Sequence, residues 1–92
     1  MFMLVKIELQ NFSLWKSIWD KEKTVRESYG CVSEKIFRNS ITDKEVFILT
    51  EWEDIEDAQE FGMSDDLRKS LGKSGGLGIP YQAGVEPKTL KD

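Results

Sequence analysis

The segment Val46-Phe47-Ile48-Leu49-Thr50-Glu51-Trp52 leads almost directly into Asp54-Ile55-Glu56-Asp57-Ala58, and this junction decides the fold. The first segment predicts a strand because nearly all of its side chains are apolar or β-branched. The second predicts a helix start, because Asp54 followed by Asp57 resembles a capping box. A looser copy of this strand-to-helix junction follows residues 3–10. The sequence therefore predicts two repeats of a β-α-β unit.

The composition is that of one small folded domain. The 92 residues are 39% hydrophobic and 33% charged, which suits a single core under a charged surface. A chain of this length buries only about 60 to 65% of the surface that its unfolded state exposes, so the core is marginal by itself. We expect a single domain over residues 1–87 and a short polar tail over residues 88–92.

Charge and cysteine content limit the partners and the location. The net charge of −4 comes from 17 acidic and 13 basic residues, and the basic residues are interspersed with acids, which argues against nucleic-acid binding. Lys6 and Glu8 interrupt the apolar N-terminus well short of a signal peptide or a membrane span. The single cysteine, Cys31, excludes an internal disulfide and fits a reducing compartment. We therefore expect a cytoplasmic protein with no nucleic-acid or membrane partner.

Hydrophobic periodicity predicts the remaining elements. Residues 3–10 alternate as a strand, and residues 12–29 carry the 3.6-residue period of one helix, started by Asn11 or Ser13 and ended by Gly30. Residues 31–38 predict a second strand, joined by a turn at 39–44 to the strand at 46–52. The next helix should turn Ile55, Ala58 and Phe61 inward, weaken at Gly62 and restart at a new cap around Ser64. A flexible glycine-rich loop over 72–80 and a last strand over 81–85 complete the chain.

This order of elements predicts an α+β fold of the ferredoxin-like type. In a βαββαβ chain the strands form an antiparallel sheet, with the helices on one face. The strand at 46–52 is apolar on both of its sides, however, and one layer of helices covers only one of them. The other face of the sheet should therefore bind a partner.

Several segments carry a resemblance to a known family. They are Phe12-Ser13-Leu14-Trp15-Lys16, Lys35-Ile36-Phe37-Arg38-Asn39, the strand at 46–52, and Asp57-Ala58-Gln59-Glu60-Phe61 followed by Leu67-Arg68. In this order and spacing, residues 3–86 resemble the dimeric α/β-barrel superfamily, and within it small proteins similar to antibiotic-biosynthesis monooxygenases. The resemblance implies a homodimer in which two sheets pack through their helix-free faces. It also implies a pocket between the helices and the sheet of each subunit.

The resemblance leaves the activity open. Enzymes of this family include cofactor-independent oxygenases that act on polycyclic aromatic compounds, and haem-degrading oxygenases that rely on a histidine ligand. The present chain contains no histidine, so we expect no haem and no other cofactor. No cysteine, histidine or carboxylate spacing predicts a metal site either, because the clustered acids are explained by helix starts.

Aromatic residues are the first candidates for a binding site. Trp15, Trp19, Trp52 and Phe61 would form an aromatic wall for a small planar ligand, and three tryptophans are more than a small domain needs for packing alone. The alternative is that these side chains are ordinary core or interface residues.

Two arginines and the glycines complete the list of candidates. Arg68 lies where the resembling proteins often carry arginine and would hold a substrate carboxylate or phenolate; alternatively, it pairs with Asp65 or Glu60 at the surface. Arg38 would contribute to a polar patch in the pocket, or form a cross-strand ion pair with Glu51. The glycines of residues 72–78 fit neither a phosphate loop nor a dinucleotide fingerprint and predict a mobile connection or lid.

The sequence leaves two hypotheses for the function. The first is a homodimer with an aromatic-lined pocket that acts as a cofactor-independent monooxygenase-like enzyme on a small aromatic compound, with Arg68 and Trp52 positioning the substrate. The alternative is a non-catalytic ligand-binding or assembly module, which the absence of histidine favours. Both hypotheses are consistent with the sequence, as are a reactive and an unreactive Cys31.

Overall fold

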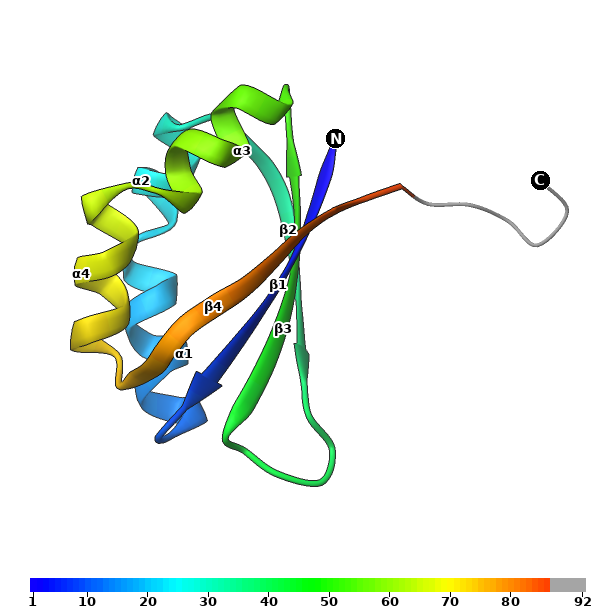
Figure 1. Ribbon diagram of the computed structural model, residues 1–92. Helices are drawn as coiled ribbons and strands as arrows, with labels where there is room; N and C mark the ends of the chain where they lie inside the picture. The colour runs from blue at the N-terminus through cyan, green and yellow to red at the C-terminus, as the bar shows by residue number, and fades with distance from the viewer. Residues whose placement is uncertain (87–92) are drawn as a thin grey trace, which may run out of the picture.

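The protein has a single antiparallel sheet covered by helices on one face (Figure 1). The structure, a computed structural model, describes residues 1–86, apart from the side chains at positions 78 and 79, so the predicted tail at 88–92 lies outside it. The elements are β1 (Phe2–Leu9), α1 (Phe12–Lys21), α2 (Lys23–Ser28), β2 (Cys31–Arg38), β3 (Glu45–Trp52), α3 (Ile55–Gly62), α4 (Asp65–Lys73) and β4 (Gly76–Val85). The strand order is β2-β3-β1-β4. This confirms the ferredoxin-like fold class.

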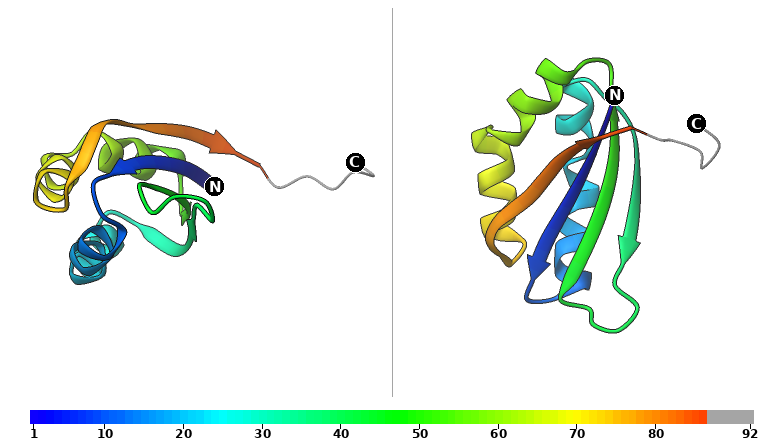
Figure 2. Two further views of the ribbon diagram at one scale, coloured as in Figure 1. Left: turned by 90° about the horizontal axis from the view of Figure 1, so that it is seen from below. Right: turned by 45° about the vertical axis from the view of Figure 1, so that its right-hand side comes forward.

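The core lies between the sheet and the helices, and Figure 2 shows the other face of the sheet uncovered. Alternation along β3 sends Val46, Ile48, Thr50 and Trp52 to the helical side, where all four are buried. β1 contributes Ile7 and Leu9 to the same layer. The two central strands thus provide the floor of the core, as the pattern of residues 46–52 predicts.

The first helical segment breaks at Glu22, so the prediction of one helix over residues 12–29 is wrong. Asn11 caps α1 through a 2.9 Å hydrogen bond from the Leu14 backbone N–H. At the break, the Trp19 carbonyl accepts the backbone N–H of Glu22 at 3.2 Å and the Arg26 Nη1 at 2.7 Å. In a continuous helix the Trp19 carbonyl would accept a hydrogen bond from the backbone N–H of Lys23. Here the Arg26 guanidinium donates to it instead.

The second helical segment divides where the sequence predicts. Asp54 caps α3 by accepting the Asp57 backbone N–H at 3.0 Å, and Ser64 caps α4 by accepting that of Leu67 at 3.2 Å. Ala58 and Phe61 are buried, as expected. Ile55 is 50% exposed, so its predicted inward orientation is wrong.

Most of the predicted glycine loop is regular structure. α4 continues to Lys73, Gly75 makes the turn with a positive φ of 76°, and β4 already begins at Gly76. Gly76 pairs with Leu9 of β1. The prediction of a mobile connection or lid over the later glycines is therefore wrong, because their backbone belongs to the sheet.

Candidate functional site

A small cavity lies inside the core, between the sheet and the helices. Its volume is about 20 Å³. Its lining is Met3, Val5 and Ile7 of β1, Thr50 and Trp52 of β3, Gln82 of β4, Trp19 of α1, Ala58 and Phe61 of α3, and Leu67 of α4. None of these side chains is charged. A space this size holds about one water molecule, so any larger ligand requires the helices to move.

Three of the predicted aromatic residues meet at this inner cavity. Trp52 packs on Phe61 with ring centroids 5.4 Å apart, and Trp19 lines the wall beside them. Trp15 is fully buried and stacks on Trp19 at 5.2 Å, but it does not line the cavity. The aromatic wall therefore exists, with Trp15 as its support; ligand binding by these residues stays a prediction.

Some polar groups of the inner cavity already form hydrogen bonds within the protein, and one does not. Trp52 Nε1 donates to Thr50 Oγ1 at 2.8 Å, and Thr50 Oγ1 donates to the Met3 carbonyl at 3.3 Å. These bonds fix the Trp52 ring and use the hydroxyl. Within residues 1–86, the Gln82 amide has no hydrogen-bond partner, which makes it a polar group still available to a ligand.

A second, smaller void lies in the seam between α1–α2 and α4. Its volume is about 10 Å³, and Trp19, Phe61 and Leu67 line both it and the inner cavity. Its remaining lining is Glu22, Val25, Arg26, Asp66 and Ser70. The seam thus lies next to the inner cavity, with three side chains between the two spaces.

One hydrogen bond joins the two sides near this seam. Tyr29 donates its hydroxyl to Asp66 Oδ2 at 2.9 Å, and its ring meets Phe61 edge-on at 5.4 Å. The hydrogen bond to the carboxylate raises the pKa of Tyr29. This contact holds the start of α4 against the end of α2.

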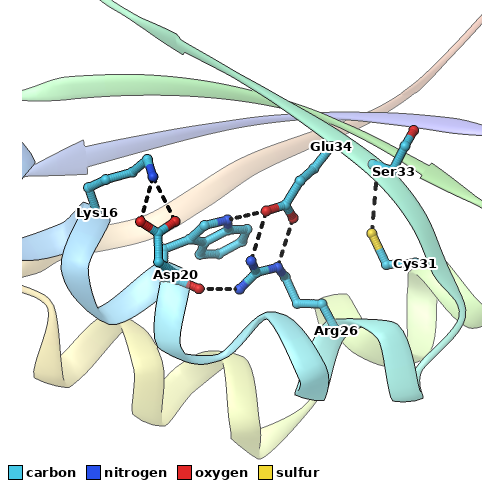
Figure 3. Close-up of polar contacts among 7 residues, drawn as sticks. Lys16, Asp20, Arg26, Cys31, Ser33 and Glu34 are labelled. Atoms are coloured by element: carbon cyan, nitrogen blue, oxygen red, sulfur yellow. Dashed lines mark hydrogen bonds and ion pairs between the residues drawn. The ribbon is translucent and has the colours of Figure 1, made fainter.

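Sequence reasoning missed a buried ion pair beside Trp19 (Figure 3). Arg26 is 2% exposed, and its Nε and Nη2 each donate to a Glu34 carboxylate oxygen at 2.8 Å. Trp19 Nε1 donates to Glu34 as well, at 3.2 Å. The signal was present: Arg26 follows Trp19 by seven residues and therefore shares its helical face, where a charge requires a buried partner.

An open groove lies outside this pair, between α1–α2 and the edge strand β2. Its volume is about 520 Å³, and its lining contains charges of both signs, among them Lys16, which pairs with Asp20 at 2.6 Å. Cys31 also lines it, and burial raises the pKa of this thiol. The carboxylate of Glu34 is already paired with Arg26 and Trp19, so it is not free to bind a ligand in the groove.

The two predicted arginines lie away from the inner cavity. Arg38 is exposed, stacks over the Phe12 ring at 4.8 Å and stands opposite Val46 in the sheet. Glu51 stands opposite Ser33, so the predicted Arg38–Glu51 ion pair is wrong. Arg38 is not part of the cavity lining either.

Arg68 is a surface residue of α4. It pairs with Asp65 at 3.4 Å, as the alternative interpretation predicts, and its side chain is 73% exposed. It lines neither the cavity nor the seam. The predicted cooperation of Arg68 with Trp52 is therefore not supported by the positions of these residues.

The helix-free face of the sheet is largely apolar. Strand alternation and register place these side chains on it: Phe2 and Leu4 of β1, Phe37 of β2, Phe47 and Leu49 of β3, and Tyr81, Ala83 and Val85 of β4. Phe37 is 51% exposed and Tyr81 62% exposed in the single chain. A Lys6–Glu45 ion pair at 3.2 Å borders the patch, and the Asn39 amide together with Lys6 lowers the pKa of Glu45. An apolar patch drawn from four strands is typical of an interface.

The described residues form neither a cluster of metal ligands nor a membrane-spanning helix. Within residues 1–86, no three cysteine, aspartate or glutamate side chains gather closely enough to hold a metal ion. None of the helices in this part is both long and apolar enough to cross a bilayer.

Comparison with known proteins places the fold. No model of a protein family matches the sequence, and neither does any curated protein sequence. Solved structures do match. One from Bordetella bronchiseptica, grouped with the antibiotic biosynthesis monooxygenases, superposes with a TM-score of 0.81 at 12% identity, covering 96% of both chains.

Two further matches are oxygenases of Streptomyces. SnoaB of Streptomyces nogalater, a cofactor-independent oxygenase, gives a TM-score of 0.72 at 9% identity and covers 99% of this chain and 96% of its own. The ActVA-Orf6 monooxygenase of Streptomyces coelicolor, solved with nanaomycin D, gives 0.67 at 18% identity, with 96% and 87% covered. Such identities establish the fold and not the reaction. The chain thus has the same fold as these antibiotic biosynthesis monooxygenase structures.

Proposed function

We propose that this protein is a cytoplasmic homodimer that binds a small, flat, uncharged aromatic compound between its sheet and its helices and oxidises it without a cofactor. The observation that carries the proposal is the inner cavity, whose lining includes Trp19, Trp52 and Phe61 but no charged side chain. Aromatic walls favour a planar apolar ligand. The oxygenase structures with the same fold support the type of reaction.

The chemistry places few demands on the protein. An electron-rich aromatic with an acidic CH₂ group can lose a proton and reduce dioxygen itself, giving a carbonyl and one water from CH₂ and O₂. The protein then supplies orientation and a dry cavity. Trp52, held by its hydrogen bond to Thr50, and Phe61 would position the ring.

The dimer is proposed to form through the helix-free face. Phe37, Phe47 and Leu49 belong to the apolar patch that faces away from the helices. A chain of 92 residues has a marginal core, and burying this patch against a second copy would remove apolar surface from water. The fold match to dimeric α/β-barrel proteins supports the same arrangement.

The alternative function is a non-catalytic ligand-binding or assembly module. The size of the inner cavity favours it, because about 20 Å³ is far below the roughly 300 Å³ of an ordinary ligand pocket. In this alternative, Trp19, Trp52 and Phe61 are ordinary core residues, and the protein acts through the surface that its dimer presents.

Two measurements test the proposal. Native mass spectrometry of the purified protein should show a dimer, with added mass if a ligand is retained. Oxygen uptake with a dihydroxyanthrone should exceed the rate of spontaneous oxidation, and Ala58→Leu, which fills the cavity, should abolish the excess while Lys69→Leu on the exposed side of α4 keeps it.

Each result favours one function. A dimer with no excess oxygen uptake and no retained mass would favour the assembly module. Equal oxygen uptake by Ala58→Leu and the parent protein would show that the inner cavity is not the site of the reaction.

A further inference from the structure

Glu22 carries a buried oxygen without a hydrogen-bond partner. In the part of the chain that the structure describes, its Oε1 is the one side-chain polar atom that is buried and unpaired. An ionised carboxylate prefers several donors, and burial without one is destabilising. A bound group that donates a hydrogen bond to this oxygen would account for its position.

The neighbouring donors are committed elsewhere. Arg26, which shares the seam lining with Glu22, directs its guanidinium to Glu34 and to the Trp19 carbonyl. Across the seam, Tyr29 donates to Asp66. Ser70 lines the same void but forms no hydrogen bond with Glu22. The protein itself therefore leaves Glu22 Oε1 as an acceptor without a donor.

The position of Glu22 connects this acceptor to the inner cavity. The void that Glu22 lines is bounded by Trp19, Phe61 and Leu67, which are also walls of the cavity. A ligand ring that displaced these side chains would therefore reach from the cavity to the seam. α4 is the element that would have to move, because it supplies Leu67 and is a separate helix between Ser64 and Gly75.

We propose that Glu22 is the polar anchor of the ligand site and accepts a hydrogen bond from a hydroxyl group on the ligand ring when α4 tilts outward. The inference rests on the proposed function and narrows the ligand to a flat, neutral, hydroxylated aromatic. Glu22 and Asp66 repel anions at the seam, where the one cation of the lining, Arg26, is already paired with Glu34, and the inner cavity contains no cation. Carboxylated analogues are therefore excluded.

Matched naphthalenes test this assignment in the full-length protein. 1-Naphthol carries the donor, 1-methoxynaphthalene lacks it, and 1-naphthoate carries a charge instead. Binding is followed in ¹H–¹⁵N spectra through the indole N–H signals of Trp19 and Trp52. We expect the unmodified protein to prefer 1-naphthol over 1-methoxynaphthalene by about tenfold, the value of a hydrogen bond to a charged acceptor, and to reject 1-naphthoate.

Variants of Glu22 test its role as the anchor independently of whether the pocket binds a ligand. Glu22→Met should bind 1-naphthol and 1-methoxynaphthalene equally well. Glu22→Gln, which keeps a neutral acceptor, should prefer 1-naphthol by about threefold. Glu27→Met, on the exposed side of α2, is the matched control and should behave like the parent protein.

Two results would overturn the assignment in different ways. An unchanged preference in Glu22→Met, with binding intact, would reject Glu22 as the anchor and leave the aromatic pocket standing. Absence of any Trp19 or Trp52 response in the unmodified protein would reject the pocket, and the anchor with it.

Discussion

Arg26 lies over the ring of Trp19, with its Cζ 4.0 Å from the ring centroid, and also donates to the backbone carbonyl of the same residue at 2.7 Å. The guanidinium thus holds both the side chain and the main chain of Trp19, a wall of the inner cavity. Glu34 completes the arrangement by bonding both Arg26 and the Trp19 indole. The position of this wall therefore depends on β2, which supplies Glu34.

Breaking this pair should be costly. Arg26→Met leaves Glu34 with its side chain only 17% exposed and without its cation, so we expect the free energy of unfolding to fall by about 3 kcal/mol. The double variant Arg26→Met/Glu34→Met should recover most of the loss. Lys16→Met, which breaks the exposed pair with Asp20, should change stability by less than about 0.5 kcal/mol. Urea unfolding measures the stability of all three variants. If Arg26→Met and the double variant lost the same free energy of unfolding, the cost would not come from leaving Glu34 unpaired.

A charge on the helix-free face should disrupt the proposed dimer. Phe37→Glu places a carboxylate in the apolar patch on an edge strand, where the folded chain tolerates it better than in the centre. We expect sedimentation equilibrium to give the mass of a monomer. Ile41→Glu is the control, because Ile41 is 94% exposed in the turn between β2 and β3. A dimer that survives Phe37→Glu would place the interface elsewhere.

Loss of the Tyr29 hydroxyl should loosen α4. Tyr29→Phe keeps the ring against Phe61 but removes the bond to Asp66, so backbone amides of α4 should exchange with solvent faster. Because this bond raises the pKa of Tyr29, its contribution is complete below the unfolded-state pKa of about 10 and is lost as the pH rises through the higher folded-state value. Exchange rates that are equal in both proteins at neutral pH would show that the bond does not restrain α4.

The Cys31 thiol should react slowly near neutral pH. Burial raises its pKa, so less of the nucleophilic thiolate is present than in a free cysteine. We expect the alkylation rate with iodoacetamide to rise at a higher pH in the folded protein than in urea, where the thiol titrates at about 8.5. Coincident pH profiles would contradict this prediction. Cys31→Ser gives the background rate.

Two glycines should respond to alanine in opposite directions. Gly30 has a φ of 106°, and a Cβ there would lie 2.7 Å from Asp57 Oδ2, so Gly30→Ala should cost about 1 to 2 kcal/mol. Gly72 lies in α4, where a Cβ would meet no atom within 4 Å, so Gly72→Ala should stabilise the protein by up to about 1 kcal/mol. Thermal unfolding distinguishes the two, and a neutral Gly30→Ala would contradict the strain argument.

The sequence predicts the fold where local pattern and tertiary contact agree. The strand at 46–52 and the cap at Asp54 follow from neighbouring residues, and both are confirmed. The break at Glu22 is different, because Arg26 is held by Glu34 from another element. Likewise, Gly76 becomes a strand residue through pairing with Leu9, far away in the sequence.

The candidate site was predictable in its apolar part only. Trp19, Trp52 and Phe61 meet because the helical and strand periods place them on the core side. Arg38 and Arg68 fall outside because a charged side chain on a short element can turn to solvent at little cost, which residue type alone does not reveal. The size of the cavity depends on how closely the side chains interlock, and no sequence pattern encodes that.

The break at Glu22 also bears on the stability of α2. α2 has only six residues, too few to persist as an isolated helix in water. Its Arg26 finds a partner only when β2 has joined the sheet, since Glu34 stands opposite Thr50 of β3. α2 therefore depends for its stability on the β2–β3 hairpin, through the ion pair between Arg26 and Glu34.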